Sequence, residues 1–354
     1  MKKVYVITFQ KALNYGAALQ AYALAKYLRS SNFEVEIINY APTYFLLQTY
    51  RPAKGIKKSF DKLKKILAFS AFSSKHLPLT KNIYFTSKSI TKISDGDAFI
   101  CGSDQIWNYR LTGGKFDKAF FLDFVPADSR RIAYAASAGS IRVHDHISEV
   151  KELTSKFHAI GAREETLASD LEGMIDKTRL TVVVDPSLLI KDYVDVFDQR
   201  RIPVTKYILS YVVGSGEMLA RYEQAVTELK KTTDIPVIHI GAKHVNSADI
   251  NILDVSPGEW VSFIKNADFV ITNSFHGTAF SINFEKQFIF IPHIVENLNA
   301  RQTTLLARVG LMNRCALHTK DIKFDKQAIN YSEVSPKLES VVHASKQFLL
   351  ESLR

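Results

Sequence analysis

The chain has 354 residues and is 46% hydrophobic, with only 15 glycines and 10 prolines. A chain of this length typically forms two domains, and this composition argues against long disordered regions. The formal net charge of +10 at pH 7 suits an anionic substrate, a nucleic acid or an anionic membrane surface, and it does not choose among them.

Other features of the sequence narrow the classes of partner and the compartment. The chain lacks zinc-finger spacing and an RNA-binding aromatic signature, and its basic residues are scattered, so we expect no nucleic-acid partner. Cys101 and Cys315 are far apart and indicate neither a disulfide framework nor a metal site, which fits a reducing compartment. The start of the chain resembles a signal peptide, but its apolar run is short and ends at Gln10, so we interpret it as a strand. No apolar run is long enough to span a bilayer, and we expect a cytoplasmic protein.

Strand-like and helix-like patterns alternate along the first half of the chain. A strand, an amphipathic helix and a second strand open the sequence, and this order favours a parallel sheet with helices on its faces. Further strands of the buried type each end at small or polar residues. The predicted strands are 4–9, 34–39, 97–101, 131–137, 159–162 and 180–184, and the predicted helices are 17–30 and 153–158.

The composition changes at residues 191–206, a mixed and charged segment, and a second α/β series follows. An apolar stripe marks a last helix from Pro336. We therefore predict two doubly wound α/β domains, at residues 1–190 and 206–330, and a C-terminal helix at 335–354. In the second series the predicted strands are 207–213, 236–240, 269–273 and 288–292, and the predicted helices are 217–231, 256–266 and 277–284.

Residues 51–76 form a basic amphipathic insertion in the first predicted domain. One interpretation is a surface helix with a solvated basic face, and the other is a helix that rests on an anionic membrane surface. The sequence leaves both open. The apolar stripe of this insertion comprises Ile56, Phe60, Leu63, Ile66 and Leu67.

Polar segments follow several predicted strands, and open parallel sheets bind ligands beyond the carboxyl ends of their strands. After the first strand, Asn14 is suited to cap the next helix, and Gly16 lets a ligand approach the backbone closely. The alternative is an ordinary strand-to-helix turn. Gln20 is a further candidate in this segment.

A mixture of small, acidic, amide and aromatic side chains at 102–108 follows the strand 97–101. This mixture can bind a sugar, because Ser103 and Gln105 offer hydrogen bonds and Trp107 offers an apolar face. Asp104 can accept a proton from a hydroxyl group. The alternative is that Asp104 caps a helix and Trp107 lies in the core.

Three charged or titratable residues are candidates for anion binding. Arg163, followed by two glutamates, suits bidentate recognition of a carboxylate or phosphate, unless it forms a surface salt bridge. His276 lies at a predicted helix start, where it can exchange protons near neutral pH, unless backbone carbonyls hold it. Arg301 falls near another predicted helix start and either binds phosphate or is solvated. The chain has no Walker loop, no Gly-x-Gly-x-x-Gly and no nucleophile elbow, so nothing in it demands a metal or a cofactor.

Taken together, the polar segments resemble the polysaccharide pyruvyl transferase family. Any one of them is weak evidence, but six of them in the order of the family are specific, and they cover most of the chain. The segments are NYGAALQAYAL at 14–24, GSDQIWN at 102–108, YAASAG at 134–139, REE at 163–165, DPSLL at 185–189 and SFHGT at 274–278.

This resemblance implies two Rossmann-like domains facing a cleft, similar to the B-type glycosyltransferase arrangement. It implies phosphoenolpyruvate as the donor and co-substrate, and a sugar as the acceptor, usually within a lipid-linked repeat unit of a surface polysaccharide. The product is a pyruvate ketal that bridges two hydroxyls of one sugar. The first domain is expected on the acceptor side and the second on the donor side. Such an enzyme works in the cytoplasm or peripherally at the inner face of the plasma membrane.

The resemblance, together with its position at a helix end, makes His276 the candidate catalytic acid or base. Some family members carry Arg-Leu-His-Gly where this chain has Ser-Phe-His-Gly at 274–277, so another cation must hold the donor, and Arg163 and Arg301 are the candidates. Asp104 is the second catalytic candidate. The remaining donor-side candidates are Ser274, Gly277 and Thr278, and the acceptor-side candidates are Asn14, Gly16, Gln20, Ser103, Gln105 and Trp107.

Two other functions stay open on the sequence. A B-type glycosyltransferase that uses a nucleotide sugar would release a nucleoside diphosphate instead of inorganic phosphate. A non-catalytic relative would bind a glycan and show no turnover with any donor.

Overall fold

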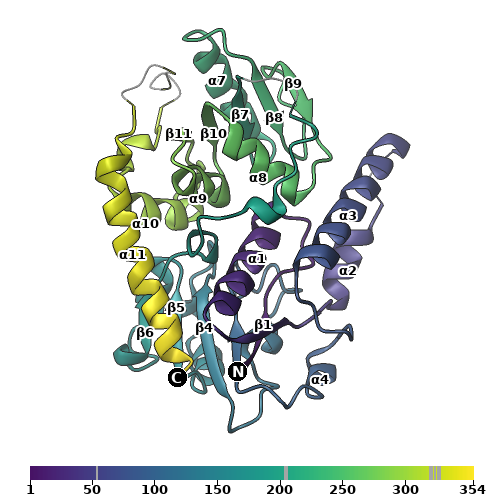
Figure 1. Cartoon of the computed structure of the whole chain (residues 1–354), viewed down its shortest axis with the longest axis vertical. Coiled ribbons are helices and arrows are strands. Elements are labelled where there is room, and N and C mark those ends of the chain that lie inside the picture. Colours follow the sequence, from purple (N-terminus) through teal and green to yellow (C-terminus); the bar gives the residue numbers. More distant parts are fainter. Residues whose placement is uncertain (53–54, 203–205, 319–321, 323, 325–327) are drawn as a thin grey trace. The chain divides into compact units, whose positions relative to one another are not determined.

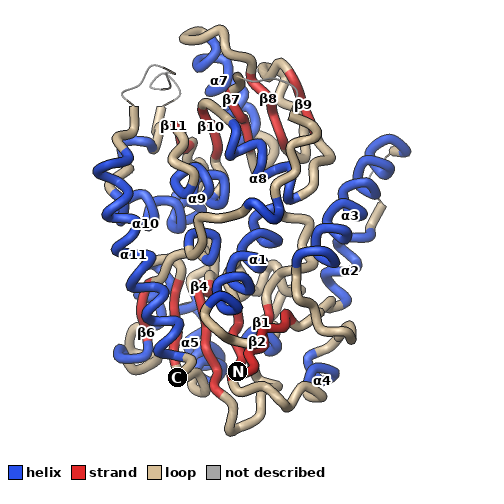
Figure 2. The backbone as a smooth tube through the Cα atoms, in the orientation of Figure 1, coloured by secondary structure: helices blue, strands red, loops and turns tan. Residues whose placement is uncertain are grey.

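Two parallel sheets, each with its own helices, organise the chain. The computed structural model describes residues 1–52, 55–202, 206–318, 322, 324 and 328–354. Unit 1 comprises Met1–Pro52, Phe69–Ile190 and Ser340–Arg354, and unit 2 comprises Ala53–Ala68 and Lys191–Glu339. Figure 1 shows the elements in chain order, and Figure 2 distinguishes helices from strands.

The sheet of unit 1 has the order β2-β1-β3-β4-β5-β6, and all of its neighbouring strands are parallel. Its strands are short and mostly buried, which is why they read as apolar runs in the sequence. The order reverses between β1 and β3, and this point is where ligands bind in doubly wound sheets. The strands are β1 (Lys3–Ile7), β2 (Glu34–Ile37), β3 (Ala98–Cys101), β4 (Arg130–Ala136), β5 (Ala159–Ala162) and β6 (Leu180–Val182).

Helices of unit 1 follow these strands. The side chain of Asn14 accepts a hydrogen bond from the Ala17 amide and caps α1, as predicted. The predicted helix at 153–158 was placed too late, because α5 buries only Val150, Leu153 and Thr154 and so shows little helical periodicity. The helices are α1 (Tyr15–Ser30), α2 (Thr43–Tyr50), α4 (Ser87–Ile90), α5 (Ile147–Thr154) and α6 (Glu165–Leu171).

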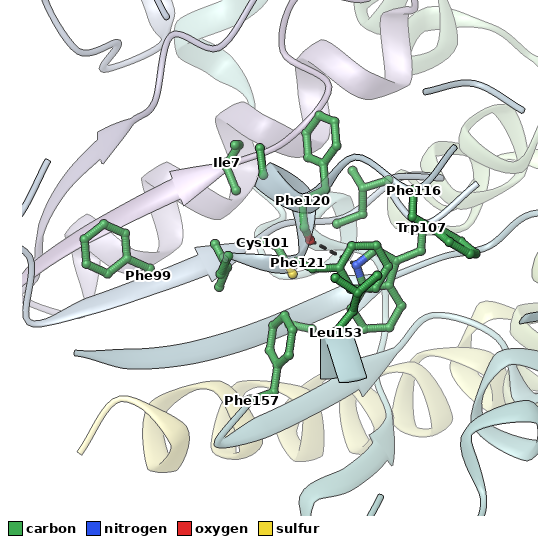
Figure 3. Close-up of a cluster of buried hydrophobic side chains, with 14 of the residues drawn as sticks. Ile7, Phe99, Cys101, Trp107, Phe116, Phe120, Phe121, Leu153 and Phe157 are labelled. Carbon is green, nitrogen blue, oxygen red and sulfur yellow. Dashed lines mark hydrogen bonds between the residues drawn. The ribbon is translucent and has the colours of Figure 1, made fainter. Parts of the chain in front are cut away.

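The core of unit 1 is rich in aromatic rings. Trp107 is 1% exposed, stacks on Phe121 with ring centroids 5.0 Å apart, and donates from Nε1 to the Phe120 carbonyl at 3.0 Å. Figure 3 shows the indole among these rings and Phe116. Trp107 therefore belongs to the core and offers no apolar face to a sugar, which corrects its assignment to the acceptor side. A large, rigid indole fills the interior well and still finds a partner for its one donor.

The sheet of unit 2 is also parallel and has the order β11-β10-β7-β8-β9. The order reverses between β7 and β10. The edge strand β9 was not predicted, because it has three half-buried residues with an asparagine between two isoleucines. The strands are β7 (Ile208–Tyr211), β8 (Val237–Ile240), β9 (Ile250–Ile252), β10 (Phe269–Thr272) and β11 (Gln287–Phe290).

Strong local signals fix the helices of unit 2. Ser256 and Glu259 form a capping box around α8, and Pro257 occupies its first turn, so this helix begins where the sequence predicted. The left-handed Gly310 ends α10. The helices are α7 (Glu217–Lys230), α8 (Pro257–Asn266), α9 (Phe275–Asn283) and α10 (Ala300–Val309).

The last helix, α11 (Tyr331–Ser352), begins before the predicted start at Pro336. Proline removes one backbone donor, and the helix forms around it nonetheless. The part of α11 in unit 1 is tied to the sheet: Val184 N donates to Ser345 Oγ at 3.0 Å, and Arg130 Nε donates to the Ser352 carbonyl at 2.8 Å. Residues 340–354 therefore complete unit 1.

The segment 51–76 contains the helix α3 (Ile56–His76). Phe69 and Phe72 are buried, and the Phe69 ring lies 5.3 Å from the ring of Tyr15 in α1. The C-terminal part of α3 is thus anchored in unit 1. Within the described ranges, no helix combines the length and the apolar character needed to cross a bilayer.

Candidate functional site

The reversal point of the sheet in unit 1 carries a buried polar junction. Thr8, directly after β1, donates from Oγ1 to the Ser103 carbonyl at 2.9 Å, just after β3. Gln20 of α1 donates from Nε2 to Thr8 Oγ1 at 2.8 Å, and its Oε1 is buried without a hydrogen-bond partner among the described residues. Two predicted site residues, Gln20 and Ser103, therefore lie on one junction. A buried acceptor that the protein leaves unpaired suits a bound hydroxyl or water.

Arg163 is the centre of a buried ion-pair cluster at the ends of β3, β5 and β6. Its Nη1 donates to Asp185 Oδ2 at 2.9 Å and to Ser103 Oγ at 3.2 Å. Its Nη2 lies 3.6 Å from Asp104 Oδ1. Ser103 Oγ also donates to Asp185 Oδ2 at 2.6 Å. The structure thus joins three predicted site residues from two separate segments.

These contacts revise the prediction for Arg163. Its side chain is 1% exposed, so it forms no surface salt bridge. Burial lowers the pKa of the guanidinium, but Asp185 and Asp104 raise this pKa by more, and Arg163 stays charged. Because carboxylates already surround it, Arg163 holds these carboxylates together, and the structure does not support its predicted role in binding an anion.

A third carboxylate adjoins this cluster. Glu164 Oε1 accepts from Ser137 Oγ at 2.8 Å and from the Ala138 amide at 3.1 Å, just beyond the end of β4. Glu164 is fully buried. The strand ends of unit 1 therefore present three acidic side chains around one guanidinium, an arrangement that favours hydroxyl-bearing or cationic groups over anions.

Two strained residues lie beside this cluster. Asp104 has φ +79° and Ala135 has φ +54°, a region that costs a non-glycine residue roughly 1–2 kcal/mol. The register between β4 and β5 shifts between Ala133 and Ala136. Such irregularities re-aim side chains and occur often at functional sites. Here they set the direction in which the Asp104 carboxylate leaves the backbone.

The structure also places the other acceptor-side candidates, Gln105, Asn14 and Gly16. Gln105 is half-buried, and a Cβ on the left-handed Gly139 would lie 2.0 Å from its Oε1, so this position needs glycine. Asn14 is exposed and caps α1. Gly16 is the second residue of α1 and has helical backbone angles, so it is not a special turn residue.

The reversal point of unit 2 is fixed by an asparagine clamp. Asn273 follows β10, and its side-chain amide exchanges two hydrogen bonds of 2.7 Å with the backbone of Val213, just after β7. Thr272 Oγ1 donates to the Tyr211 carbonyl at 2.7 Å and accepts from the Ser274 amide at 3.0 Å. Three side-chain hydrogen bonds therefore hold the end of β10, just before the turn that carries His276, against the end of β7.

The predicted donor-side residues build the N-terminus of α9. Ser274 is the N-cap, and its Oγ accepts from the Gly277 amide at 3.4 Å. Thr278 Oγ1 donates to the Ser274 carbonyl at 3.0 Å. A Cβ on Gly277 would lie 2.4 Å from Thr272 Oγ1, so helix and strand approach closely only because this residue is glycine. His276 is buried in the first turn of α9.

A second helix N-terminus contacts this loop. Gln302, in the first turn of α10, donates from Nε2 to the Asn273 carbonyl at 3.2 Å. Asn299 precedes α10 and is held by two hydrogen bonds to the backbone of His293. Arg301 lies half-buried in the same first turn, at the predicted helix start. Two helix N-termini, a histidine and an arginine thus share one strand-end region, which favours an anion.

Sequence reasoning missed several of these residues. Gln302 and Asn273 join α9 to α10. Gln302 was not singled out, because amides are common in polar loops, and Asn273 was predicted as the end of a strand without a partner. Asp185 was noted only as part of a family segment, since nothing in the sequence pairs it with Arg163. A signal was available for Asn273 and Asp185, because each lies at the end of a predicted strand.

The family comparison covers most of the chain. Residues 14–293 match the polysaccharide pyruvyl transferase family. No curated protein matches the chain.

Solved structures show the same fold at low identity. One is the UDP-GlcNAc 2-epimerase of Neisseria meningitidis bound to UDP-GlcNAc, with TM-score 0.53, 12% identity, and coverage of 100% of this chain and 99% of that chain. Another is Anabaena HepE in complex with UDP and glucose, with TM-score 0.51, 9% identity, and coverage of 100% and 99%. A third is the UDP-GlcNAc 2-epimerase of Methanocaldococcus jannaschii, with TM-score 0.50, 12% identity, and coverage of 100% and 99%.

The fold and the strand-end sites define the class: this is an α/β protein with two parallel-sheet domains, similar to the B-type glycosyltransferases. The match over residues 14–293 then shows the family. The chain belongs to the polysaccharide pyruvyl transferases, as its six segments predicted.

Proposed function

We propose that this protein transfers the enolpyruvyl group of phosphoenolpyruvate to a sugar of a surface polysaccharide, or of its lipid-linked repeat unit, and forms a pyruvate ketal. Family membership supports the transfer of a pyruvyl group. One structural observation carries the donor site: the 3.2 Å hydrogen bond from Gln302 to the Asn273 carbonyl joins the N-termini of α9 and α10 beside His276 and Arg301.

Ketal formation from phosphoenolpyruvate needs a proton transfer, two new carbon–oxygen bonds and the loss of phosphate. The methylene carbon of the donor gains a proton and becomes a methyl group. Two sugar hydroxyl oxygens bond to the carbon that carries the phosphate, the bond from this carbon to the phosphate oxygen breaks, and inorganic phosphate leaves. The two sugar hydroxyls lose one proton each. One of these protons offsets the proton that the methyl group gains, and the other leaves with inorganic phosphate. An acid, a base, and positive groups for the carboxylate and phosphate meet these demands.

Unit 2 supplies groups for the donor in this proposal. The helix N-termini and Arg301 bind the negative charges, since main-chain amides there lack intrahelical partners. His276, in the first turn of α9, exchanges the proton with the methylene carbon. Ser274 replaces the arginine of some relatives and caps α9, so Arg301 supplies the missing charge.

Unit 1 supplies groups for the acceptor. Asp104 orients or deprotonates a sugar hydroxyl, and Arg163 and the strained backbone fix its direction. Gln20 Oε1 and Gln105 offer hydrogen-bond acceptors at the same strand ends. The acidic character of this cluster suits a neutral polyol better than the trianionic donor.

The first experiment combines phosphoenolpyruvate with galactosides and mannosamine-type glycosides, free and lipid-linked. Phosphate release together with the mass gain of a ketal supports the proposal. His276→Asn is expected to lower this turnover by roughly 10²-fold or more, the usual size of acid–base catalysis. A folded His276→Asn variant with wild-type turnover would remove His276 from the reaction.

Donor binding is measured separately by calorimetry with phosphoenolpyruvate alone. Arg301→Gln is expected to weaken binding at least about tenfold, as for loss of one charge-assisted contact. Arg308→Gln, at the opposite end of α10, is the matched control and should bind as the wild type does. Equal affinity of all three proteins would place the donor elsewhere.

The nucleotide-sugar alternative rests on the fold. The Neisseria meningitidis epimerase was solved with UDP-GlcNAc and Anabaena HepE with UDP and glucose. Release of UDP from a UDP-sugar, without ketal formation from phosphoenolpyruvate, would favour this alternative. Glycan binding without turnover on either donor would indicate a non-catalytic relative.

A further inference from the structure

The N-terminal half of α3 turns an apolar stripe toward solvent. Ile56, Phe60, Leu63 and Leu67 are 93%, 57%, 50% and 60% exposed. Their spacing of four, three and four residues places all four on one helix face. A soluble helix normally buries such a stripe, so this face is suited to a partner that covers it.

The stripe is distinct from the face by which α3 packs on its own protein. Phe69 and Phe72 are buried, and Ile66 and Lys65 are half-buried. At 100° per residue these side chains project away from the side on which Phe60 and the rest of the stripe lie. The same helix therefore has one inward and one outward apolar face.

Charge decides which partner the outward face fits. Residues 51–76 contain eight lysines and arginines and one acidic residue, so this segment alone carries +7 of the net charge of +10. Lys58 and Lys64 are exposed, and Lys64 Nζ lies 4.7 Å from the centre of the Phe60 ring. A second copy of this chain would bring the same positive charge to the contact, which disfavours self-association.

The residues just before α3 have the same character. In α2, Leu47 is 74% and Tyr50 is 62% exposed. Arg51 follows and is exposed as well. Apolar side chains, a tyrosine and basic residues on one short stretch are the composition of segments that lie in the interface of a membrane.

We propose that α3 binds the surface of an anionic lipid bilayer. The stripe of Ile56, Phe60, Leu63 and Leu67 enters the boundary between headgroups and acyl chains, and Lys58 and Lys64 contact lipid phosphates. This inference does not rest on the proposed reaction, because the surface and its charge are independent of the strand-end sites.

Flotation with vesicles tests the inference on the full chain. Vesicles of equal parts phosphatidylglycerol and phosphatidylcholine are compared with vesicles of phosphatidylcholine alone, at low and high salt. We expect binding to the anionic vesicles only, and weaker binding at high salt because ions screen the attraction. Absence of binding to anionic vesicles, or equal binding to both kinds, would overturn the proposal.

Two double variants test the apolar stripe and the neighbouring lysines separately. Phe60→Ser/Leu67→Ser and Lys58→Glu/Lys64→Glu should each lower the vesicle-bound to free ratio at least about tenfold. Matched controls on other exposed positions, Val194→Ser/Leu317→Ser and Lys115→Glu/Lys118→Glu, should bind like the wild type.

Unchanged binding of the stripe variant contradicts the proposal, and so does equal loss in its control. All of these positions are exposed, so we expect every variant to fold. An unfolding midpoint equal to that of the wild type checks this. Light scattering tests the alternative that a second copy of this chain covers the stripe. If the wild type were a dimer and the stripe variant a monomer, the face would bind a second copy, and the membrane proposal would be overturned.

Discussion

Arg163 Nη1 donates to Asp185 Oδ2 at 2.9 Å, and both side chains are shielded from water. Asp104 approaches the same guanidinium from a third strand end. A buried ion pair is a weak source of net stability, but removal of one partner leaves the others charged and uncompensated. The pair therefore gives the acidic cluster its geometry and makes the cluster sensitive to loss of the cation.

Arg163→Met is expected to lower the free energy of unfolding by about 3–5 kcal/mol, because carboxylates then lose their buried counter-charge. Urea unfolding measures this loss. Lys156→Met removes an exposed ion pair with Asp123 and is the control, with an expected change of at most about 1 kcal/mol. If Arg163→Met lowered the free energy of unfolding by no more than Lys156→Met does, the Arg163 cluster would be well solvated.

Asp104→Asn tests the proposed role of this carboxylate. Asparagine tolerates the left-handed backbone and has nearly the same shape, so the fold should persist. Without the carboxylate, ketal formation should fall by roughly 10²-fold. The measurement is phosphate release under saturating donor. A folded variant with full turnover would restrict Asp104 to a structural role.

Gly277→Ala probes the close approach of α9 to β10. In an open helix this change is stabilising, by up to about 1 kcal/mol. Here the new Cβ would lie 2.4 Å from Thr272 Oγ1, so we expect a loss of about 1–3 kcal/mol. A double-mutant cycle with Thr272→Ala isolates the clash: the double variant should be more stable than the sum of the single losses predicts. Simple additivity would argue against the clash.

His239 gives unit 2 a dependence on pH. Burial lowers the pKa of its imidazole from 6.5 to about 4, and the hydrogen bonds to the Lys243 carbonyl at 3.0 Å and to Ser210 Oγ at 2.9 Å offset this only in part. The folded pKa lies below the unfolded one, so the unfolded chain binds more protons between these values. Stability from His239 is complete above pH 6.5 and falls as pH decreases toward 4.

The shift corresponds to about 3 kcal/mol across that window, at 1.36 kcal/mol per pKa unit. Urea unfolding at several pH values measures the slope for the wild type and for His239→Gln. The variant should be less stable at neutral pH and lose less stability on acidification. Parallel profiles would mean that His239 is solvated.

The sequence predicted the strands well because most of them are buried on both faces. β3 is an unbroken apolar run, and in β1, β7, β8 and β10 a single polar residue accompanies the apolar ones, so these strands are recognised without knowing any other element. β9 was missed, since it has only three residues and lies at the edge of its sheet. Local patterns also revealed the start of α8, where Ser256 and Glu259 signal a cap.

The candidate sites were predictable only in part. Strand ends located Ser103, Asp104, Arg163 and His276, because parallel sheets bind ligands there. Partners could not be predicted: Asp185 lies 22 residues after Arg163 and meets it only through the strand order. Trp107 was assigned to sugar binding because a residue type does not reveal whether its ring faces outward or inward.

The discontinuity of unit 1 has a consequence for biosynthesis. A nascent chain leaves the ribosome from its N-terminus, so β1 to β6 emerge early. Residues 340–354, which carry the partners of Val184 and Arg130, are translated only after all of unit 2. The unit that begins first is thus completed last. Until then the amide of Val184 lacks the Ser345 hydroxyl that accepts its hydrogen bond in the folded protein, and water takes that place.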